Sequence, residues 1–313
     1  METEPPAQEV GATQGVLKNE RSVEWPTLLL LTGCYLSWGI TVFGLAAVSI
    51  PVAVLSGMAV IALHSSLTHE AVHGHPFQNE KLNEALLFPA LGLVIPYRRF
   101  RDLHLAHHVD SRLTDPYDDP ETCYLDPEVW AQLSPLMQAI LTANNTLAGR
   151  LILGPAIALF AFVRGDIAAM RSGDRSVRNA WLIQIPAALI VLMVLATAPM
   201  PLWAYLFSCY GALSILKIRT FLEHRAHERA NGRTVVIEDR GPLAFIFLNN
   251  NLHAVHHAHP RVAWYNLPGI WAQNRDGYLR RNEGYYYRSY AEVFARYFWR
   301  GKEPVAHPLW RKR

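Results

Sequence analysis

Charged residues are scarce in this chain, and two long stretches contain none. Asp, Glu, Lys and Arg together make up 18% of the 313 residues, whereas an average soluble domain carries about 25%. No charged residue occurs at 26–68 or at 180–216. Buried soluble helices are one explanation for such runs, but their length favours segments that cross a membrane.

The sequence also lacks the features of several other protein classes. The three cysteines, Cys34, Cys123 and Cys209, are scattered without any CxxC pair, which argues against a disulfide framework or a thiolate zinc site. The net charge of +3 is small and the basic residues lie beside apolar runs, so nucleic acid is not expected as a partner. Residues 1–25 have neither the basic nor the apolar region of a signal peptide. We expect them to form a disordered tail.

The two uncharged stretches predict four transmembrane helices. A spanning helix needs about 20 apolar residues, so each stretch accommodates two helices joined by a tight turn. Proline and small residues place these turns at 49–51 and 197–201. The helices would therefore form two hairpins. The shorter apolar runs at 85–96 and 151–163 are expected to be interfacial or re-entrant segments.

Lysine and arginine predict the orientation of these hairpins. The two turns contain neither residue, whereas basic residues flank the outer ends of the hairpins. They are Lys18, Arg21, Arg98, Arg99, Arg101, Arg171, Arg175, Arg178, Lys217 and Arg219. Basic residues collect on the cytoplasmic side of a membrane. Both termini, including the tail, and the region between the hairpins are therefore predicted to be cytoplasmic.

Residues 271–313 form a C-terminal segment that carries an amphipathic pattern. Tyr290, Val293, Phe294, Tyr297 and Phe298 recur at a helical spacing. This helix either lies in the membrane interface or packs against the bundle. Both placements remain open from the sequence.

Histidine is concentrated in clusters. Eight of the 14 histidines form three motifs, which are His69 with His73, His104 with His107 and His108, and His253 with His256 and His257. Side chains three and four residues apart share one face of a helix, and every motif follows an apolar run on the predicted cytoplasmic side. Imidazole binds iron, zinc, copper or nickel, and one tetrahedral site uses four ligands. The motifs therefore predict two metal ions, and imidazole ligands alone leave iron and zinc open.

Two further histidines, His224 and His227, follow the second hairpin, and spacing leaves open which of them completes the ligand set. Glu70, Glu223 and Glu228 are candidates for orienting the imidazoles, because a metal-bound histidine usually donates its second N–H to a carboxylate or carbonyl. A solvated or salt-bridged role is the alternative for these acids. Four histidines lack a converging pattern and are placed outside the metal site, namely His64, His75, His259 and His307.

These motifs resemble those of the membrane fatty acid desaturase superfamily over residues 26–270. The family's HDxxHG motif corresponds to 69–74, with Glu70 in place of Asp, and its two HxxHH motifs stand at 104–108 and 253–257. The family's additional ligand histidine best matches His224. The flanking segments NNNL and WYNLP, on either side of the last motif, are similar to those of bacterial members. Some of these members modify small non-lipid metabolites.

The resemblance implies a non-haem diiron oxidoreductase that uses molecular oxygen. Its iron ligands would be His69, His73, His104, His107, His108, His224, His253, His256 and His257, with no catalytic residue separate from them. No HPGG haem-binding segment and no GxGxxG nucleotide-binding segment occurs. Electrons would therefore come from a separate ferredoxin-type protein and its reductase. Arg98, Arg99, Arg101 and Arg112 could dock such a donor, or merely orient the membrane segments.

The predicted fold is an all-α integral membrane bundle of four transmembrane helices in two hairpins, with a cytoplasmic helical cap that carries the dimetal site. Residues 26–270 would form the desaturase-like domain. The expected reaction is O2-dependent desaturation of a fatty acyl or other lipid substrate. A hydroxylase, ketolase or small-metabolite desaturase of the same superfamily is the alternative. A histidine-rich metal transporter or storage protein is the alternative from another class, although transporters place their ligands nearer the membrane midplane.

Overall fold

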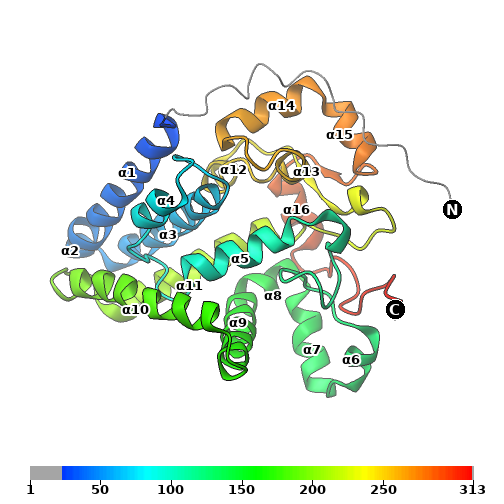
Figure 1. Cartoon of the computed structure of the whole chain (residues 1–313), viewed down its shortest axis with the longest axis horizontal. Helices are drawn as coiled ribbons and strands as arrows, with labels where there is room; N and C mark the ends of the chain where they lie inside the picture. Colours follow the sequence, from blue (N-terminus) through cyan, green and yellow to red (C-terminus); the bar gives the residue numbers. More distant parts are fainter. Residues whose placement is uncertain (1–22, 312–313) are drawn as a thin grey trace.

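Helices make up most of the computed structural model, which describes residues 23–311 (Figure 1). Of residues 1–25, which the sequence predicts to be disordered, positions 1–22 lie outside the described range. Trp25 belongs to the first helix. The only sheet in the described residues is a parallel pair of short strands, β1 (Val236–Ile237) and β2 (Tyr286–Tyr287). A mostly helical fold is therefore confirmed.

The first uncharged stretch folds into a helical hairpin. Helix α1 (Trp25–Gly39) continues through a π-helical segment (Ile40–Leu45) into α2 (Ala46–Val48), and α3 covers Ile50–Val72. Ser49 between them is extended. Pro51 stands in the first turn of α3, where its missing N–H removes no helical hydrogen bond. The turn predicted at 49–51 is confirmed.

The second uncharged stretch forms α10 (Arg175–Ala196) and α11 (Leu202–Thr220), joined by the turn predicted at 197–201. Three helical stretches are long and apolar enough to cross a membrane, namely Trp25–Val48, Ile50–Val72 and Arg175–Ala196. Helix α11, with 19 residues, is not among the three. Its sequence mixes small, aromatic and hydroxyl residues with two basic residues in its last turn.

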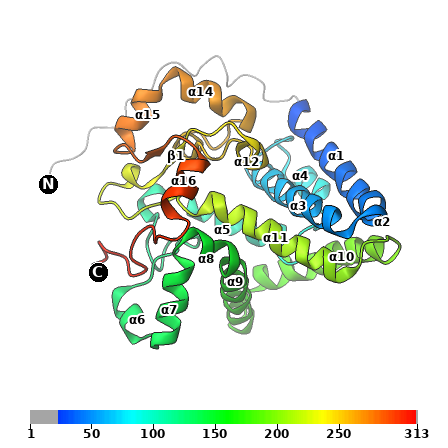
Figure 2. The same ribbon diagram turned by 180° about the vertical axis from the view of Figure 1, so that it is seen from behind.

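Helix α11 lies closely against α3 (Figure 2). A Cβ atom at Gly57 would stand 2.8 Å from the Ser208 Oγ atom, and a Cβ atom at Gly211 would stand 2.5 Å from the side chain of Met58. The two glycines therefore permit an approach that larger side chains would prevent. Tyr205 in the same interface is buried. Much of α11 is thus covered by protein rather than left to face lipid.

The outward faces of the long helices are apolar. Leu36 and Val48 on the first stretch are 64% and 87% exposed, and Met193 and Phe207 on the second hairpin are 61% and 58% exposed. Soluble proteins rarely leave so many large apolar side chains uncovered on neighbouring helices. These surfaces indicate contact with lipid.

Shorter helices fill the middle of the chain (Figure 1). They are α4 (Glu80–Leu86), α5 (Tyr97–His107), the 3-10 turn η2 (Asp110–Arg112), α6 (Pro127–Gln132), α7 (Pro135–Asn144), α8 (Leu147–Ile152) and α9 (Gly154–Arg171). The run at 85–96 is mostly irregular, and its Leu91 is buried among residues of α3 and α11. The run at 151–163 lies mainly in α9.

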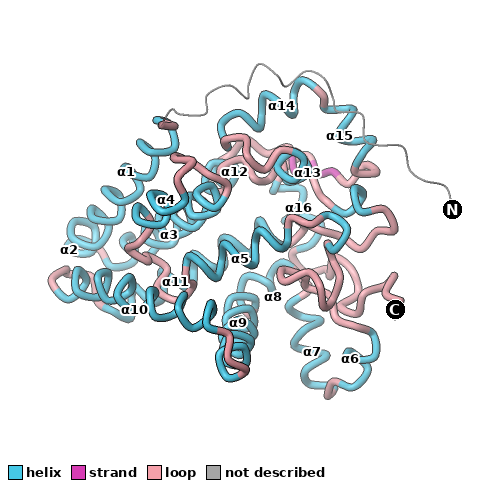
Figure 3. The backbone as a smooth tube through the Cα atoms, viewed as in Figure 1, coloured by secondary structure: helices cyan, strands magenta, loops and turns pink. Residues whose placement is uncertain are grey.

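The C-terminal part combines short helices with long loops that cover one end of the hairpins (Figure 3). Its elements are η3 (Ala230–Arg233), α12 (Pro242–Ile246), α13 (His253–Ala258), η4 (Trp264–Asn266), α14 (Leu267–Gln273), α15 (Arg275–Arg281) and α16 (Tyr290–Tyr297). In α16, Tyr290, Val293 and Tyr297 are buried in a core that also contains Phe221 and Phe247. The apolar face of the predicted amphipathic helix therefore packs within the protein.

Candidate metal centre

The three histidine motifs stand at or near helix ends that meet at one place. His69 lies in the last turn of α3, and His73 is the residue that ends this helix. The second motif closes α5, with His108 as the residue that ends the helix. The third motif forms most of α13. His224 follows the end of α11 and bridges to Thr234.

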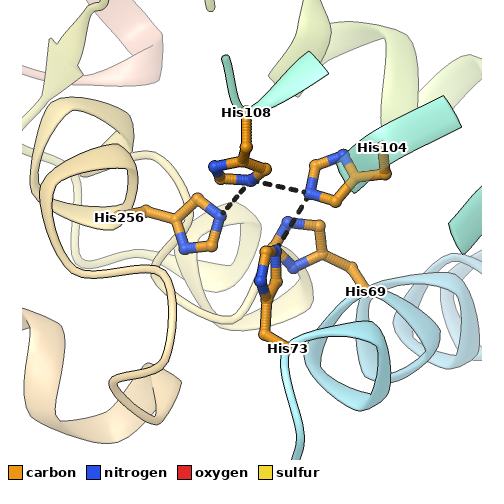
Figure 4. A group of neighbouring side chains, drawn as sticks. All are labelled: His69, His73, His104, His108 and His256. Atoms are coloured by element: carbon orange, nitrogen blue, oxygen red, sulfur yellow. Dashed lines mark hydrogen bonds between the residues drawn. The ribbon is translucent and has the colours of Figure 1, made fainter. Parts of the chain in front are cut away.

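Five imidazoles form the first group. Figure 4 shows the side chains from α3, α5 and α13 pointing toward one another. The members are His69, His73, His104, His108 and His256, and one ring nitrogen of each lies within 4.8 Å of the corresponding nitrogen of the others. The Nε2 atom of His104 is 3.0 Å from that of His73 and 3.0 Å from that of His108. The Nε2 atoms of His108 and His256 are 3.2 Å apart.

Four imidazoles form the second group, made up of His107, His224, His253 and His257. The Nε2 atom of His224 lies 2.9 Å from that of His107 and 3.2 Å from that of His253. The His224 ring is also 5.0 Å from the His257 ring, measured between centroids. All nine predicted ligand histidines thus belong to one group or the other.

Each HxxHH motif contributes to both groups. On α5, the first and last histidines (His104 and His108) join the five-histidine group and the middle one joins the other group. On α13, the first and last histidines (His253 and His257) join the four-histidine group and the middle one joins the five-histidine group. Residues i+3 and i+4 share one helix face with residue i, but they are rotated about 60° and 40° to opposite sides of it. The spacing therefore suits two neighbouring ions.

Two acids that the sequence reasoning missed orient the α5 histidines. The Nδ1 atom of His107 lies 2.7 Å from Asp119 Oδ1, and the Nδ1 atom of His104 lies 3.0 Å from Glu121 Oε1. Asp119 is itself fixed, because it also accepts the backbone N–H groups of Thr114 and Glu121. A proton held on Nδ1 leaves the Nε2 lone pair of each ring directed into its group.

An amide orients the third motif in the same way. The Nδ1 atom of His253 lies 2.8 Å from Asn250 Oδ1. The Oε1 atom of Glu70 lies 3.4 Å from the Nδ1 atom of His69, and its Oε2 atom accepts the backbone N–H of Trp264 at 3.1 Å. Glu223 pairs with Arg219 at 2.9 Å, while its distance to the Nδ1 atom of His253 is 3.8 Å. The third acid considered, Glu228, is exposed.

The charges around the two groups favour a bound cation. Burial and the neighbouring histidines lower the pKa of His73 and of His256, so these rings are neutral near pH 7 and keep a lone pair. Burial opposes the charged form of His107, but Glu121 and Asp119 raise its pKa to about 9. A metal ion that binds at Nε2 would therefore displace a proton from this ring. Burial would raise the pKa of Glu121, yet His107 and His104 hold it well below its usual range. Negative charge therefore stands beside each group.

The nitrogen spacing fits metal coordination. Two nitrogens that each lie about 2.1 Å from one ion stand about 3 Å apart when they subtend a right angle. The shortest Nε2–Nε2 distances within the groups are 2.9–3.2 Å. His104 and His107 offer lone pairs at Nε2 because their Nδ1 atoms face carboxylates. Imidazoles with an ordered carboxylate partner are the donor set that iron and zinc use in proteins.

The remaining histidines lie outside both groups. Their nearest polar partners are Tyr35 for His64, Glu24 for His75, Arg229 for His227, Tyr278 for His259 and Thr114 for His307. The choice of His224 over His227 therefore agrees with where the two side chains lie.

A cavity of about 880 Å³ adjoins the metal groups. His69, His107 and His224 contribute to its wall. Much of the rest of the wall is apolar and comes from α3, α10, α11 and the irregular segment after α4, for example Ile61, Leu91 and Ala187. Apolar pockets that carry a few convergent polar groups are the usual form of a small-molecule site.

Comparison with known proteins places these features in a family. A search of curated proteins returned no match. The family model described as fatty acid desaturase matches residues 26–290, which is most of the chain. Three apolar helices and two groups of metal-ligating histidines accompany this match. The chain therefore belongs to the fatty acid desaturase family of membrane oxidoreductases.

Proposed function

We propose that this protein is a membrane-bound, O2-dependent non-haem diiron oxidoreductase that desaturates a fatty acyl chain. The observation that carries the proposal is the division of nine imidazoles into two adjacent groups, in a chain of the fatty acid desaturase family. One iron would be held by the five-histidine group and the other by the four-histidine group. Bound iron supplies the oxygen chemistry that removes hydrogen from an unactivated C–H bond.

The chain's own residues would orient the ligands and keep water away. Asp119, Glu121 and Asn250 hold the protons of three ligand imidazoles on Nδ1, which keeps Nε2 available for a metal. The apolar cavity wall beside His107 and His224 accommodates hydrocarbon rather than water. Substrate carbons in this cavity would lie next to the ligand groups.

The proposed topology has four spans, α1–α2, α3, α10 and α11. Helix α11 is shorter and less apolar than the others, but it needs less lipid-facing surface because α3 covers one of its faces. Lys217 and Arg219 stand in its last turn, and the histidine motifs lie at the corresponding ends of α3 and α5. By the positive-inside rule, these ends and the metal centre would be cytoplasmic.

The electron source would be a separate ferredoxin-type protein with its reductase. Three of the arginines expected to dock it are paired within the protein, as Arg98–Glu84, Arg99–Asp166 and Arg101–Asp102. Such pairing leaves little surplus charge on that surface. We therefore do not place the donor there.

The test is product analysis in a living membrane. The chain is expressed in a host that supplies a ferredoxin and its reductase, and cellular fatty acids are profiled by mass spectrometry. A new unsaturated acyl species that disappears in His107→Ala supports the desaturase. Hydroxylated or keto products, or an oxidised small metabolite, would instead support the other activities known in the superfamily. Bound zinc without any oxidised product would contradict an oxidoreductase and favour metal transport or storage.

A further inference from the structure

Six basic side chains line the cavity beside the histidines. Three of them form ion pairs with acids, namely Arg98, Arg99 and Arg219, and the other three form a separate group. Arg150 on α8, Lys217 on α11 and Lys302 near the C-terminus line the cavity together with the thiol of Cys123. Arg150 is 5% exposed. These residues come from four separate segments of the chain, so the fold rather than a local motif brings them together.

Arg150, Cys123 and Lys302 are close neighbours. The Arg150 Nη1 atom lies 3.0 Å from Cys123 Sγ. The Arg150 guanidinium carbon and the Lys302 Nζ atom each lie 5.9 Å from the centre of the Phe221 ring. Partial loss of solvation at the cavity wall would by itself raise the pKa of Cys123, but Arg150, Lys302 and Lys217 lower it to about 7. The thiol thus reports a positive potential in this part of the cavity.

Two of the cations are held by the protein itself. Arg150 donates its Nε–H to the carbonyl of Asn144 at 3.0 Å. The Lys302 ammonium donates to the backbone carbonyl of His224 at 3.3 Å. The second bond places Lys302 beside the backbone of a member of the four-histidine group. The positive charge is therefore both fixed in position and adjacent to the proposed metal centre.

Lys217 differs because its ammonium group makes no hydrogen bond or ion pair with any residue in the range 23–311. Three acidic groups face the same region, namely Cys123, Glu121 and Glu223. Each of them already contacts another side chain, and Cys123 contacts Arg150 at 3.0 Å. Glu121 contacts His104 at 3.0 Å, and Glu223 contacts Arg219 at 2.9 Å. A partly buried ammonium without a hydrogen-bonded counter-ion is unfavourable. A bound anion would relieve this cost.

We propose that Arg150, Lys217 and Lys302 bind the oxyanion headgroup of the substrate, a carboxylate or a phosphate. The hydrocarbon part would lie against the apolar wall that includes Ile61 and Leu91. This inference rests on the proposed function, because it assumes that the cavity is where the substrate binds. A neutral ester or an uncharged lipid would leave the Lys217 ammonium without a hydrogen-bonded counter-ion.

Cys123 provides a direct test. It is exposed and lines the cavity, whereas Cys34 and Cys209 are buried. The purified full-length protein in neutral detergent is treated with iodoacetamide, and alkylation of Cys123 is followed by mass spectrometry. The added probes are palmitate, hexadecyl phosphate and methyl palmitate. Methyl palmitate matches palmitate in chain length but carries no charge. The readout needs neither bound iron nor turnover, so a failure of the desaturase reaction would not affect it.

The proposal predicts that palmitate or hexadecyl phosphate slows alkylation about tenfold, while methyl palmitate slows it less than about twofold, as expected for loss of a charge-assisted contact. The stronger of the two anions identifies the headgroup as carboxylate or phosphate. Protection, measured as the ratio of rates with and without probe, should be lost in Lys217→Met and retained in Lys217→Arg. Lys81→Met changes an exposed lysine on α4 and serves as the matched control.

Two results would overturn the proposal. Equal protection by palmitate and its methyl ester would show that the cavity does not recognise the charge. Protection by either anion that survives in Lys217→Met would show that the anion binds elsewhere. Since Lys217 makes no bond within the protein, its replacement by methionine should leave the folded structure intact.

Discussion

The carboxylate of Asp119 offers a selective way to weaken one metal position. It accepts the Nδ1–H of His107 at 2.7 Å and the backbone N–H groups of Glu121 at 3.0 Å and Thr114 at 2.9 Å. In Asp119→Asn, one of the two oxygens becomes an NH2 group. Either the His107 side or the Thr114 side then presents a donor to a donor. The substitution also removes the negative charge next to His107.

The size of the effect follows from these contacts. Loss of a residue that orients a metal-bound histidine weakens metal binding about 10- to 100-fold, equivalent to about 1.4–2.7 kcal/mol. His107 belongs to the four-histidine group alone. The iron in that group should therefore be weakened, while the iron in the five-histidine group should bind as before.

The assay is an anaerobic titration of metal-free protein with Fe(II), followed by iron measurement after dialysis. Asp119→Asn should retain about one iron per chain at a free iron concentration that fills both positions of the wild type. Asp118→Asn alters the neighbouring exposed acid and should behave as the wild type. If Asp119→Asn binds two irons with unchanged affinity, the role assigned to this carboxylate is wrong.

Three further predictions concern other parts of the molecule. Gly57→Leu should lower the unfolding temperature of the protein in detergent, because overpacking against α11 costs about 1–3 kcal/mol. Gly33→Leu is the control and should leave the unfolding temperature unchanged, because a Cβ atom at Gly33 has no neighbour within 4 Å. The rate of Cys123 alkylation should rise with pH around a midpoint near 7. Arg150→Met should move this midpoint upward toward the usual thiol pKa, because it removes a cation that favours the thiolate. An unchanged midpoint would contradict the positive potential assigned to this part of the cavity. The His227→Ala variant should have the same metal content per chain as the wild type, since this ring lies outside both groups.

The convergence of the clustered histidines could be predicted from the sequence because the information is local. Each HxxHH motif fixes which rings share a helix face, whatever the rest of the chain does. The two turns were equally local, since Pro51 and the prolines at 199 and 201 punctuate the uncharged stretches. The family resemblance favoured His224, and the structure places this ring in the four-histidine group.

The residues that support the ligands could not be predicted in this way. Asp119 and Glu121 lie in an irregular segment with no periodic pattern, and tertiary folding brings them back to α5. Asn250 belongs to a flanking segment that was recognised, but its contact with His253 depends on the loop before α13. Long-range pairing also escaped prediction. Arg99, which the sequence assigned either to docking an electron donor or to membrane orientation, pairs with Asp166, 67 residues away.

The fourth apolar helix illustrates the same limit. An uncharged run predicts burial from water but does not distinguish lipid from protein as the surroundings. The close contact of Gly57 with Ser208 shows that α11 directs one face to α3. Hydropathy judged along the whole helix therefore understates how well this helix suits the interior of a membrane bundle.

The most direct test of a two-ion centre is the metal content of three forms of the protein. Iron per chain is measured by mass spectrometry in the wild type, in His108→Ala from the five-histidine group and in His253→Ala from the four-histidine group. The account predicts about two irons in the wild type and about one in each variant, because each substitution removes a ligand from a single group. One metal ion per wild-type chain would contradict it. So would two metal ions retained in both variants.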